Sequence, residues 1–235
     1  MRNGFAAARP ALFAAALAAA ACGLSACAVT SAGDPASGFV SPAIARAYLP
    51  LKGPIYLVLE ARGAATVIAP GIAATNAHNA NIVDHDRIVG VSRAYDLLFF
   101  RTARRDAPSR AEPYTGETVI AYGQGVDGEL RMAEGKVRFT DAEVFPRCRS
   151  CGVQHAFAFE ADGGEGFSGG PVADAKTGKL VGITFGFRNG LDDCTPSERL
   201  MYAYDMKRVA EERANAPKFT RLPPPPPPAP EPRCG

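Results

Sequence analysis

The chain has 235 residues, of which 47% are hydrophobic and 21% charged, and its formal net charge is +2. This length allows one compact domain or two small lobes once the two ends are set aside. The near-balanced charge, with no basic stripe that carries interleaved aromatic residues, argues against nucleic-acid binding.

Residues 1–26 are predicted to be a signal peptide. Arg2 and Arg9 supply positive charge, and an alanine-rich apolar run follows at residues 11–21. That run is too short to span a membrane comfortably, as expected for a cleaved targeting segment. The segment ends with LSAC at residues 24–27. This ending resembles a bacterial lipobox, whose cysteine becomes the lipidated first residue of the mature protein.

Cys27 is therefore the predicted lipidation site. The alternative is an ordinary secretory signal cleaved after Ala28, because Ala26 and Ala28 also fit a small-residue cleavage site. Both interpretations place the protein outside the cytoplasm. Lipidation predicts a lipoprotein of the bacterial cell envelope that is attached to the membrane. The outer membrane and periplasm are favoured, because Ala28 is not the aspartate of an inner-membrane retention signal.

Short apolar runs dominate the middle of the chain. A linker is predicted at residues 27–45, where the stretch 31–42 is small, polar and rich in Pro and Gly. The runs that follow are rich in β-branched and aromatic residues and are separated by turn signals, which indicates an all-β sandwich or barrel. Strands are expected at residues 55–59, 65–69, 87–91, 96–101, 117–122, 135–139, 156–160, 180–187 and 200–204.

The last part of the chain is predicted to contain a helix and then a stiff rod. Residues 206–214 are good helix formers with charges on one face, so a terminal helix should pack on the β domain. Residues 216–235 form a Pro-rich tail with six consecutive prolines from Pro223 to Pro228. Such a run forms a polyproline II helix without internal hydrogen bonds. It is interpreted as a spacer, and binding to a Pro-recognising partner is the alternative.

The sequence GFSGGP at residues 166–171 places Ser168 among glycines. Glycine permits tight turns, and its backbone N–H groups can approach a substrate carbonyl oxygen. Upstream lie His78, in the sequence TNAH, and Asp96, at the start of an apolar run. Histidine, aspartate and serine follow one another along the chain in the order of the chymotrypsin-type triad.

Other segments, in the same order along the chain, strengthen this interpretation. Together with His78 and Ser168 they resemble trypsin-like serine peptidases of the bacterial HtrA and glutamyl-endopeptidase type, without a PDZ domain. The resemblance covers about residues 63–209, nearly all of the expected folded region. The segments that carry it are TVIAPG at residues 66–71, GETVIAYG at 116–123, GKV at 135–137, and residues 162–172 and 178–183.

The resemblance implies a trypsin-like double barrel, with two six-stranded antiparallel β-barrels and a C-terminal helix. The interval between His78 and Asp96 is short for this family, so a hairpin is missing and the first barrel should be short. The expected bounds are 46–215 for the peptidase domain, about 50–108 for the first barrel, about 114–205 for the second, and about 206–214 for the helix.

The resemblance also implies the roles of the site residues. Ser168 would be the nucleophile and His78 the base that takes its proton, because a serine hydroxyl alone is a poor nucleophile. Asp96 would orient the imidazole, with Asp84 and Asp86 as its rivals. Backbone N–H groups of Gly166 and Ser168 would form the oxyanion hole. The expected activity is that of a serine endopeptidase acting through an acyl-enzyme, without cofactor or metal.

Two further consequences follow from the resemblance. The substrate would be a protein or peptide, and the alternative is an inactive protease-like envelope protein that binds peptides, because a short first barrel weakens the triad. Phe167 stands where digestive proteases have an aspartate that pairs with a newly cut N-terminus. Activation by such a cut is therefore not expected.

Four residues are expected to contact the substrate: Asp162, Thr184, Phe185 and Gly186. Asp162 lies six residues before Ser168, where trypsin has the acidic base of its pocket, which by itself indicates cleavage after Arg or Lys. Many bacterial relatives have an aspartate there for loop structure, so specificity stays open. Thr184 replaces the histidine of glutamate-specific relatives, which argues against that specificity. Phe185 and Gly186 would line a groove to which an extended peptide adds as an edge strand.

Four cysteines are candidates for disulfide bonds: Cys148, Cys151, Cys194 and Cys234. An even number of cysteines in an exported chain favours disulfides, and three connectivities are open. A zinc site that includes His155 is one alternative, although the spacing provides only half of such a site. A redox pair is the other, although such a pair normally begins a helix.

Overall fold

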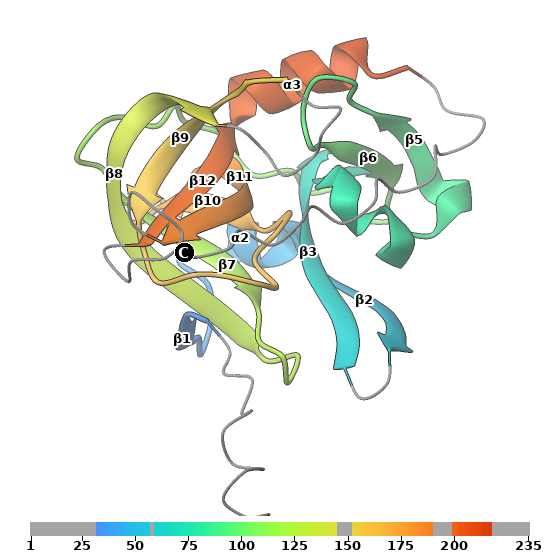
Figure 1. Cartoon of the computed structure of the whole chain (residues 1–235), viewed down its shortest axis with the longest axis horizontal. Coiled ribbons are helices and arrows are strands. Elements are labelled where there is room, and N and C mark those ends of the chain that lie inside the picture. Colours follow the sequence, from blue (N-terminus) through green and yellow to red (C-terminus); the bar gives the residue numbers. More distant parts are fainter. Residues whose placement is uncertain (1–31, 57–58, 145–151, 190–198, 218–235) are drawn as a thin grey trace, which may run out of the picture. The chain divides into compact units, whose positions relative to one another are not determined.

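A computed structural model describes residues 32–56, 59–144, 152–189 and 199–217 of the chain. These residues form a mostly β structure with two antiparallel sheets (Figure 1). The elements in chain order are β1 (Asp34–Pro35), α2 (Pro42–Ala47), β2 (Tyr48–Tyr56), β3 (Leu59–Ala69), β4 (Ile72–Thr75), the 3₁₀ helices η2 (Ala77–Ile82) and η3 (His85–Arg87), β5 (Ile88–Val91), β6 (Leu98–Arg101), β7 (Thr118–Gln124), β8 (Leu130–Val144), β9 (Gln154–Glu160), β10 (Pro171–Asp174), β11 (Leu180–Asn189), β12 (Arg199–Asp205) and α3 (Met206–Asn215).

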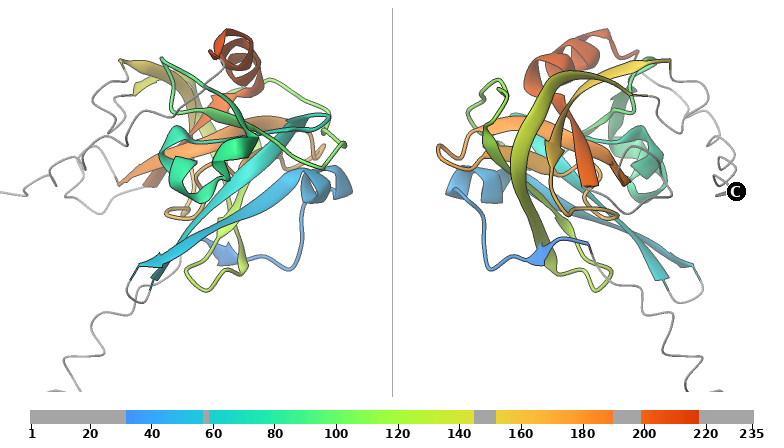
Figure 2. Two further views of the ribbon diagram at one scale, coloured as in Figure 1. Left: turned by 90° about the vertical axis from the view of Figure 1, so that its right-hand side faces the viewer. Right: turned by 60° about the vertical axis from the view of Figure 1, so that its left-hand side comes forward.

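The larger sheet closes into a six-stranded antiparallel barrel. Its strands follow the order β8, β7, β10, β11, β12 and β9, and β9 pairs back with β8. Register shifts at Val137/Phe139 and Phe139/Ala142 allow the long β8 to bend over the barrel (Figure 2). Large side chains such as Phe157 and Met201 are fully buried inside. Each such burial stabilises the fold by about 1.5–3 kcal/mol.

The smaller sheet has five strands in the order β2, β3, β4, β6 and β5. β2 and β3 run side by side as a long hairpin (Figure 2). The interval between His78 and Asp96 contains two 3₁₀ turns and the four-residue β5. The all-β class, the double barrel with a short first barrel, and the C-terminal helix are therefore confirmed. The first sheet has one strand fewer than six because this interval is too short for another hairpin.

The two barrels share a buried apolar cluster along the seam between them. Tyr95 and Phe99 from the first barrel pack there with Ile120 and Tyr204 from the second. The side-chain amide of Gln124 in β7 also donates hydrogen bonds to two carbonyl oxygens of the first sheet, at Leu51 over 3.0 Å and at Gly63. This seam brings residues that are far apart in sequence to a single site.

Two helices flank the sheets. α2 begins at a Ser-Pro pair, where Ser41 Oγ accepts the N–H of Ile44 at 3.3 Å and Ile44 is buried. Part of the segment predicted as a linker thus has regular structure. α3 begins where Asp205 caps Arg208 N–H at 2.8 Å, and it lies across both sheets (Figure 1). No helix among the described residues is long and apolar enough to cross a membrane.

Several predictions fall on residues outside the described ranges. They are the signal peptide, the lipidation site Cys27, the disulfide candidates Cys148, Cys151, Cys194 and Cys234, and most of the Pro-rich tail. These stay predictions from sequence.

Candidate active site

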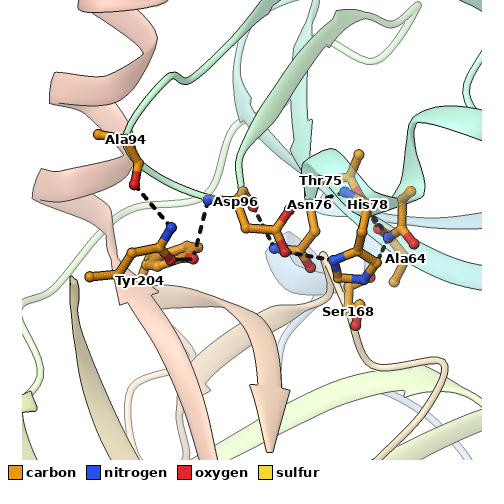
Figure 3. A network of polar contacts seen from close by, with 10 residues as sticks. Ala64, Thr75, Asn76, His78, Ala94, Asp96, Ser168 and Tyr204 are labelled. Carbon is orange, nitrogen blue, oxygen red and sulfur yellow. Dashed lines mark hydrogen bonds and ion pairs between the residues drawn. The ribbon is translucent and has the colours of Figure 1, made fainter. Parts of the chain in front are cut away.

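His78 and Asp96 form a hydrogen-bonded pair (Figure 3). Asp96 Oδ2 lies 2.6 Å from His78 Nδ1, and Asp96 Oδ1 accepts the backbone N–H of His78 at 3.0 Å. An ionised carboxylate only accepts hydrogen bonds, so Nδ1 must be the donor. In the neutral ring, Nε2 is then the nitrogen with a free lone pair, as a general base requires.

Local structure places both members of the pair. His78 lies in η2, which begins shortly after β4 ends. Asn76, the residue between β4 and η2, donates from Nδ2 to the carbonyl oxygen of Asp96 at 2.9 Å. Asp96 ends a turn in which Ser92 Oγ accepts the N–H groups of Ala94 and Tyr95 at 3.1 and 2.9 Å. These short-range bonds explain why a single Asp after β5 is held facing the histidine.

The rival carboxylates have local roles. Asp84 caps η3 by accepting the N–H of Asp86 at 3.2 Å, and both residues are exposed. The structure pairs His78 with Asp96.

The environment of His78 favours its charged form. Burial lowers the pKa of the ring, but the hydrogen bond and the negative charge of Asp96 raise it, and the net pKa lies above the usual value. The side chain is nevertheless 49% exposed, so part of the ring is open to a ligand. A histidine that is stabilised when protonated can receive a proton from a neighbouring hydroxyl.

The loop around Ser168, the predicted nucleophile, consists of two consecutive tight turns at residues 164–170. Phe167 N–H bonds to Gly164 O at 3.2 Å, and Gly170 N–H bonds to Phe167 O at 2.8 Å. The third residue of each turn is a glycine with positive φ, +87° at Gly166 and +86° at Gly169. Both turns thus have the type II signature, which requires glycine at that position. Ser168 occupies the second position of the second turn, at its apex.

The loop is attached to both barrels. Ser168 O accepts the N–H of Ala64 at 2.9 Å and the side-chain amide of Asn79, the residue after His78, at 3.1 Å. The serine backbone is therefore held next to the His78 turn. Among the described residues, the Ser168 hydroxyl makes no hydrogen bond with the His78 ring. Such bonds are often long without substrate and shorten when it binds.

Two backbone donors of this loop remain available. The N–H groups of Gly166 and Ser168, predicted to form the oxyanion hole, have no acceptor within the part of the chain that the structure describes. Phe167 between them is fully buried, and its ring fills the space beside Gly123, where a Cβ would overlap it. A buried ring, in the place of an ion pair, thus anchors the loop.

Of the residues predicted to contact the substrate, Asp162 is exposed and Thr184 is buried. Asp162 has a side chain that is 88% exposed and lies 3.1 Å from Arg199 Nη1, so it is paired and points outward. Thr184 is buried, and its backbone pairs with Gly169 and Gly170 of the loop around Ser168 at 2.8 and 3.0 Å. It therefore supports the loop through its main chain.

Phe185 and Gly186, the next two residues of β11, differ in the space around them. The buried Phe185 stacks on Tyr204, with ring centroids 4.2 Å apart. Gly186, at a register shift in β11, has open space where a side chain would be. Of this pair, Gly186 has the position that a substrate groove requires.

Sequence reasoning missed two buried polar residues of the site. Tyr204 OH accepts the backbone N–H of Asp96 at 3.3 Å (Figure 3). It also donates to the side-chain oxygen of Gln154. Gln154 Nε2 donates to Ala94 O at 2.9 Å. The only sequence signal for them is a polar group beside an apolar strand run. Within the described residues no group of three or more His, Cys, Asp or Glu side chains could hold a metal ion.

Comparison with known proteins gives a consistent fold. No family model matches the chain, and no curated protein matches it. Among solved structures, the active form of the Rv3671c protease from M. tuberculosis is 19% identical, with a TM-score of 0.61, over 81% of this chain and 91% of that chain.

Two further solved structures are similar. The HtrA-type protease AlgW with a tripeptide is 20% identical at a TM-score of 0.57, and the match covers 76% of this chain and 63% of that chain. The MamO protease domain from Magnetospirillum magneticum is 15% identical at a TM-score of 0.54, over 72% of this chain and 97% of that domain. The chain therefore has the trypsin-like double-barrel fold of these serine proteases.

Proposed function

We propose that this protein is a serine endopeptidase that hydrolyses peptide bonds with Ser168, His78 and Asp96. The observation that carries the proposal is the 2.6 Å pair of His78 and Asp96 beside a glycine-built turn with Ser168 at its apex. The hydrogen bond from Asn79 to Ser168 O supports their proximity. The shared fold with serine proteases supports the class of reaction.

Acylation follows from this arrangement. Ser168 Oγ attacks the substrate carbonyl carbon while His78 Nε2 takes the hydroxyl proton, and the carbonyl electrons move to the oxygen. The N–H groups of Gly166 and Ser168 would bind that oxyanion, and each such donor contributes about 3 kcal/mol in the transition state. The imidazolium then protonates the amide nitrogen, the C–N bond breaks and the amine leaves.

Deacylation repeats these steps with water. His78 takes a proton from the water as its oxygen attacks the ester carbonyl, and the proton returns to Ser168 Oγ when the acid product leaves. Asp96 stays ionised throughout and stabilises the imidazolium through Nδ1. No cofactor is needed, because His78 carries every proton between Ser168, the leaving amine and water.

A fluorophosphonate probe tests this proposal directly. The wild-type protein should be labelled between pH 6 and 9, and Ser168→Ala should not be labelled. Ser109→Ala, which changes an exposed serine elsewhere, is the matched control and should label normally. Absence of labelling in a well-folded wild-type protein would overturn the proposal.

A second candidate is an inactive protease-like protein that binds peptides in the envelope. It is favoured by one observation, the absence within the described residues of a hydrogen bond between the Ser168 hydroxyl and His78. Peptide-library binding to the wild-type protein, without labelling or cleavage, would support this candidate.

The proposed location is the bacterial cell envelope, with lipid attachment at Cys27. The support is the sequence LSAC after an apolar run. Radioactive palmitate should be incorporated into the wild-type protein and not into Cys27→Ala, which should leave the membrane fraction. A mature N-terminus at Val29 would instead indicate ordinary secretion.

A further inference from the structure

A buried polar network connects the second barrel to the loop that carries Asp96. Tyr204 in β12 and Gln154 in β9 are both fully buried, and their side chains hydrogen-bond to each other. Tyr204 OH also accepts the N–H of Asp96 at 3.3 Å, and Gln154 Nε2 donates to Ala94 O at 2.9 Å. Two side chains of one barrel thus bind the backbone of the other barrel at positions 94 and 96.

The proton positions in this network are fixed by its chemistry. Ala94 O can only accept, so the Gln154 amide nitrogen must face it, and its oxygen must face Tyr204. That oxygen accepts the Tyr204 hydroxyl proton, which leaves a Tyr204 lone pair for the Asp96 N–H. Each of these polar atoms has a partner of the right kind. A fully satisfied buried network of this sort holds one conformation.

Aromatic packing restrains the same loop. The Tyr95 ring meets the Tyr204 ring edge-on at 87°, with centroids 5.4 Å apart, and Arg208 Cζ of α3 lies 5.0 Å from the centroid of the Tyr95 ring. Glu212 of α3 accepts a hydrogen bond from Ser92 Oγ at 2.5 Å. The charged groups that face the network are thus Asp96, Arg208 and Glu212, and burial raises the pKa of Tyr204 well above its usual value, so its hydroxyl stays protonated.

We propose that Tyr204 and Gln154 are positioning residues that hold the Asp96 carboxylate in register with His78. Neither residue contacts the reacting atoms. They act through the backbone at positions 94 and 96, and so fix the distance between the Asp96 carboxylate and His78 Nδ1. The consequence for catalysis rests on the proposed peptidase function, but the effect on His78 itself does not.

Tyr204→Phe removes one oxygen and keeps the ring. The Asp96 N–H and the Gln154 oxygen then lose their partner, and the Asp96 loop gains freedom. Because Asp96 raises the pKa of His78, a looser carboxylate should lower that pKa by about half a unit or more. In the peptidase, kcat should fall between about tenfold and 100-fold, with KM nearly unchanged.

The control is Tyr122→Phe. Tyr122 is equally buried, and its hydroxyl accepts the N–H of Val40 at 2.7 Å, away from the Asp96 loop. The substitution removes the same atom and the same kind of hydrogen bond. It leaves one N–H without its acceptor, whereas Tyr204→Phe leaves two groups unpaired, so it should reduce stability less and leave the His78 pKa unchanged.

The experiment is an NMR titration of the three histidines in the full chain of each variant. His85 serves as the internal reference, because it lies in η3, away from the network, whereas His155 directly follows Gln154 in β9. A fall in the His78 pKa in Tyr204→Phe, with none in Tyr122→Phe, supports the proposal. An unchanged His78 pKa in Tyr204→Phe overturns it, and so does an equal fall in both variants.

A second variant covers the case in which Tyr204→Phe does not fold. Gln154→Met keeps the length of the side chain and removes both hydrogen bonds, and it should also lower the His78 pKa. Fluorophosphonate labelling of wild-type Ser168 is measured separately. If labelling fails, the peptidase proposal fails, while the titration still decides whether Tyr204 and Gln154 position Asp96.

Discussion

The side-chain amide of Asn79 donates a hydrogen bond to the carbonyl oxygen of Ser168 over 3.1 Å. Asn79 follows His78 in the first barrel, whereas Ser168 belongs to the second. The same nitrogen donates to Thr75 Oγ1 at 3.0 Å, and Thr75 donates to Ala64 O at 2.6 Å. One buried amide thus helps to fix the spacing between the two barrels at the site.

Replacement of Asn79 should therefore disturb both stability and labelling. Asn79→Ala removes the donor to the buried Thr75 Oγ1 and one of the two donors to Ser168 O, which should lower the free energy of unfolding by about 1–3 kcal/mol. Asn79→Asp should cost more, because a carboxylate would face the carbonyl oxygen of Ser168. Urea unfolding and the rate of fluorophosphonate labelling measure the two effects. Asn81→Ala, on the exposed side of the same turn, should change neither.

The glycine in the second turn of the loop around Ser168 should not tolerate a side chain. Gly169 has φ of +86°, and a Cβ there would overlap Ala64 O and Thr75 Oγ1. Gly116 has the same φ, but a Cβ at that position would meet no atom within 4 Å. Gly116→Ala should thus cost only the backbone strain, about 1–2 kcal/mol. Gly169→Ala should unfold at a clearly lower urea concentration than Gly116→Ala. Equal urea midpoints for the two variants would contradict the steric argument.

The pair of His78 and Asp96 should make stability depend on pH. The pKa of His78 is raised in the folded protein above its usual value of 6.5. The stability that protonated His78 adds is therefore fully present below pH about 6.5, and it is lost as pH rises through the pKa of His78 in the folded protein. The difference in unfolding free energy between wild type and His78→Gln should decrease from pH 6 to pH 9. In an Asp96→Asn background only the burial of the ring is left, which lowers the pKa of His78, so the same difference should no longer decrease and should instead rise with pH.

The exposed Asp162 should have little influence on cleavage preference. Its side chain is 88% exposed and paired with Arg199, and exposed pairs contribute about 0–1 kcal/mol. Asp162→Asn should change the melting temperature little and should not alter the ranking of residues before the cleaved bond. A peptide-library profile measures that ranking. Loss of a preference for Arg or Lys in the variant would show instead that Asp162 acts as an acidic pocket base.

Much of the strand pattern could be predicted, because β-branched and aromatic runs mark it. The runs at 117–122, 156–160 and 200–204 largely coincide with β7, β9 and β12. The prediction of a single strand at 55–59 is wrong, since this run crosses from the end of β2 to the start of β3. Leu57 and Val58 are not typical turn residues, so the sequence pattern does not show the break between the two strands.

The residues of the site are predictable only where a local motif carries them. His78 and Ser168 lie in short recognisable sequences, and Asp96 follows from chain order. Tyr204 and Gln154 are 108 and 58 positions from Asp96, and their role depends on strand pairing across the barrel seam. No local pattern encodes a contact of that range. The short helix α2 escapes prediction for another reason, because its six residues are few for a periodic signal.

The closed barrel offers an explanation for how so small a first sheet can serve this site. A closed six-stranded ring has no free edges along which it can slip, and it presents Ser168, Tyr204 and Gln154 as fixed points. The five-stranded sheet then needs only to bring His78 and Asp96 within reach of those points. The second barrel therefore provides the fixed part of the site, and the first barrel completes it with His78 and Asp96.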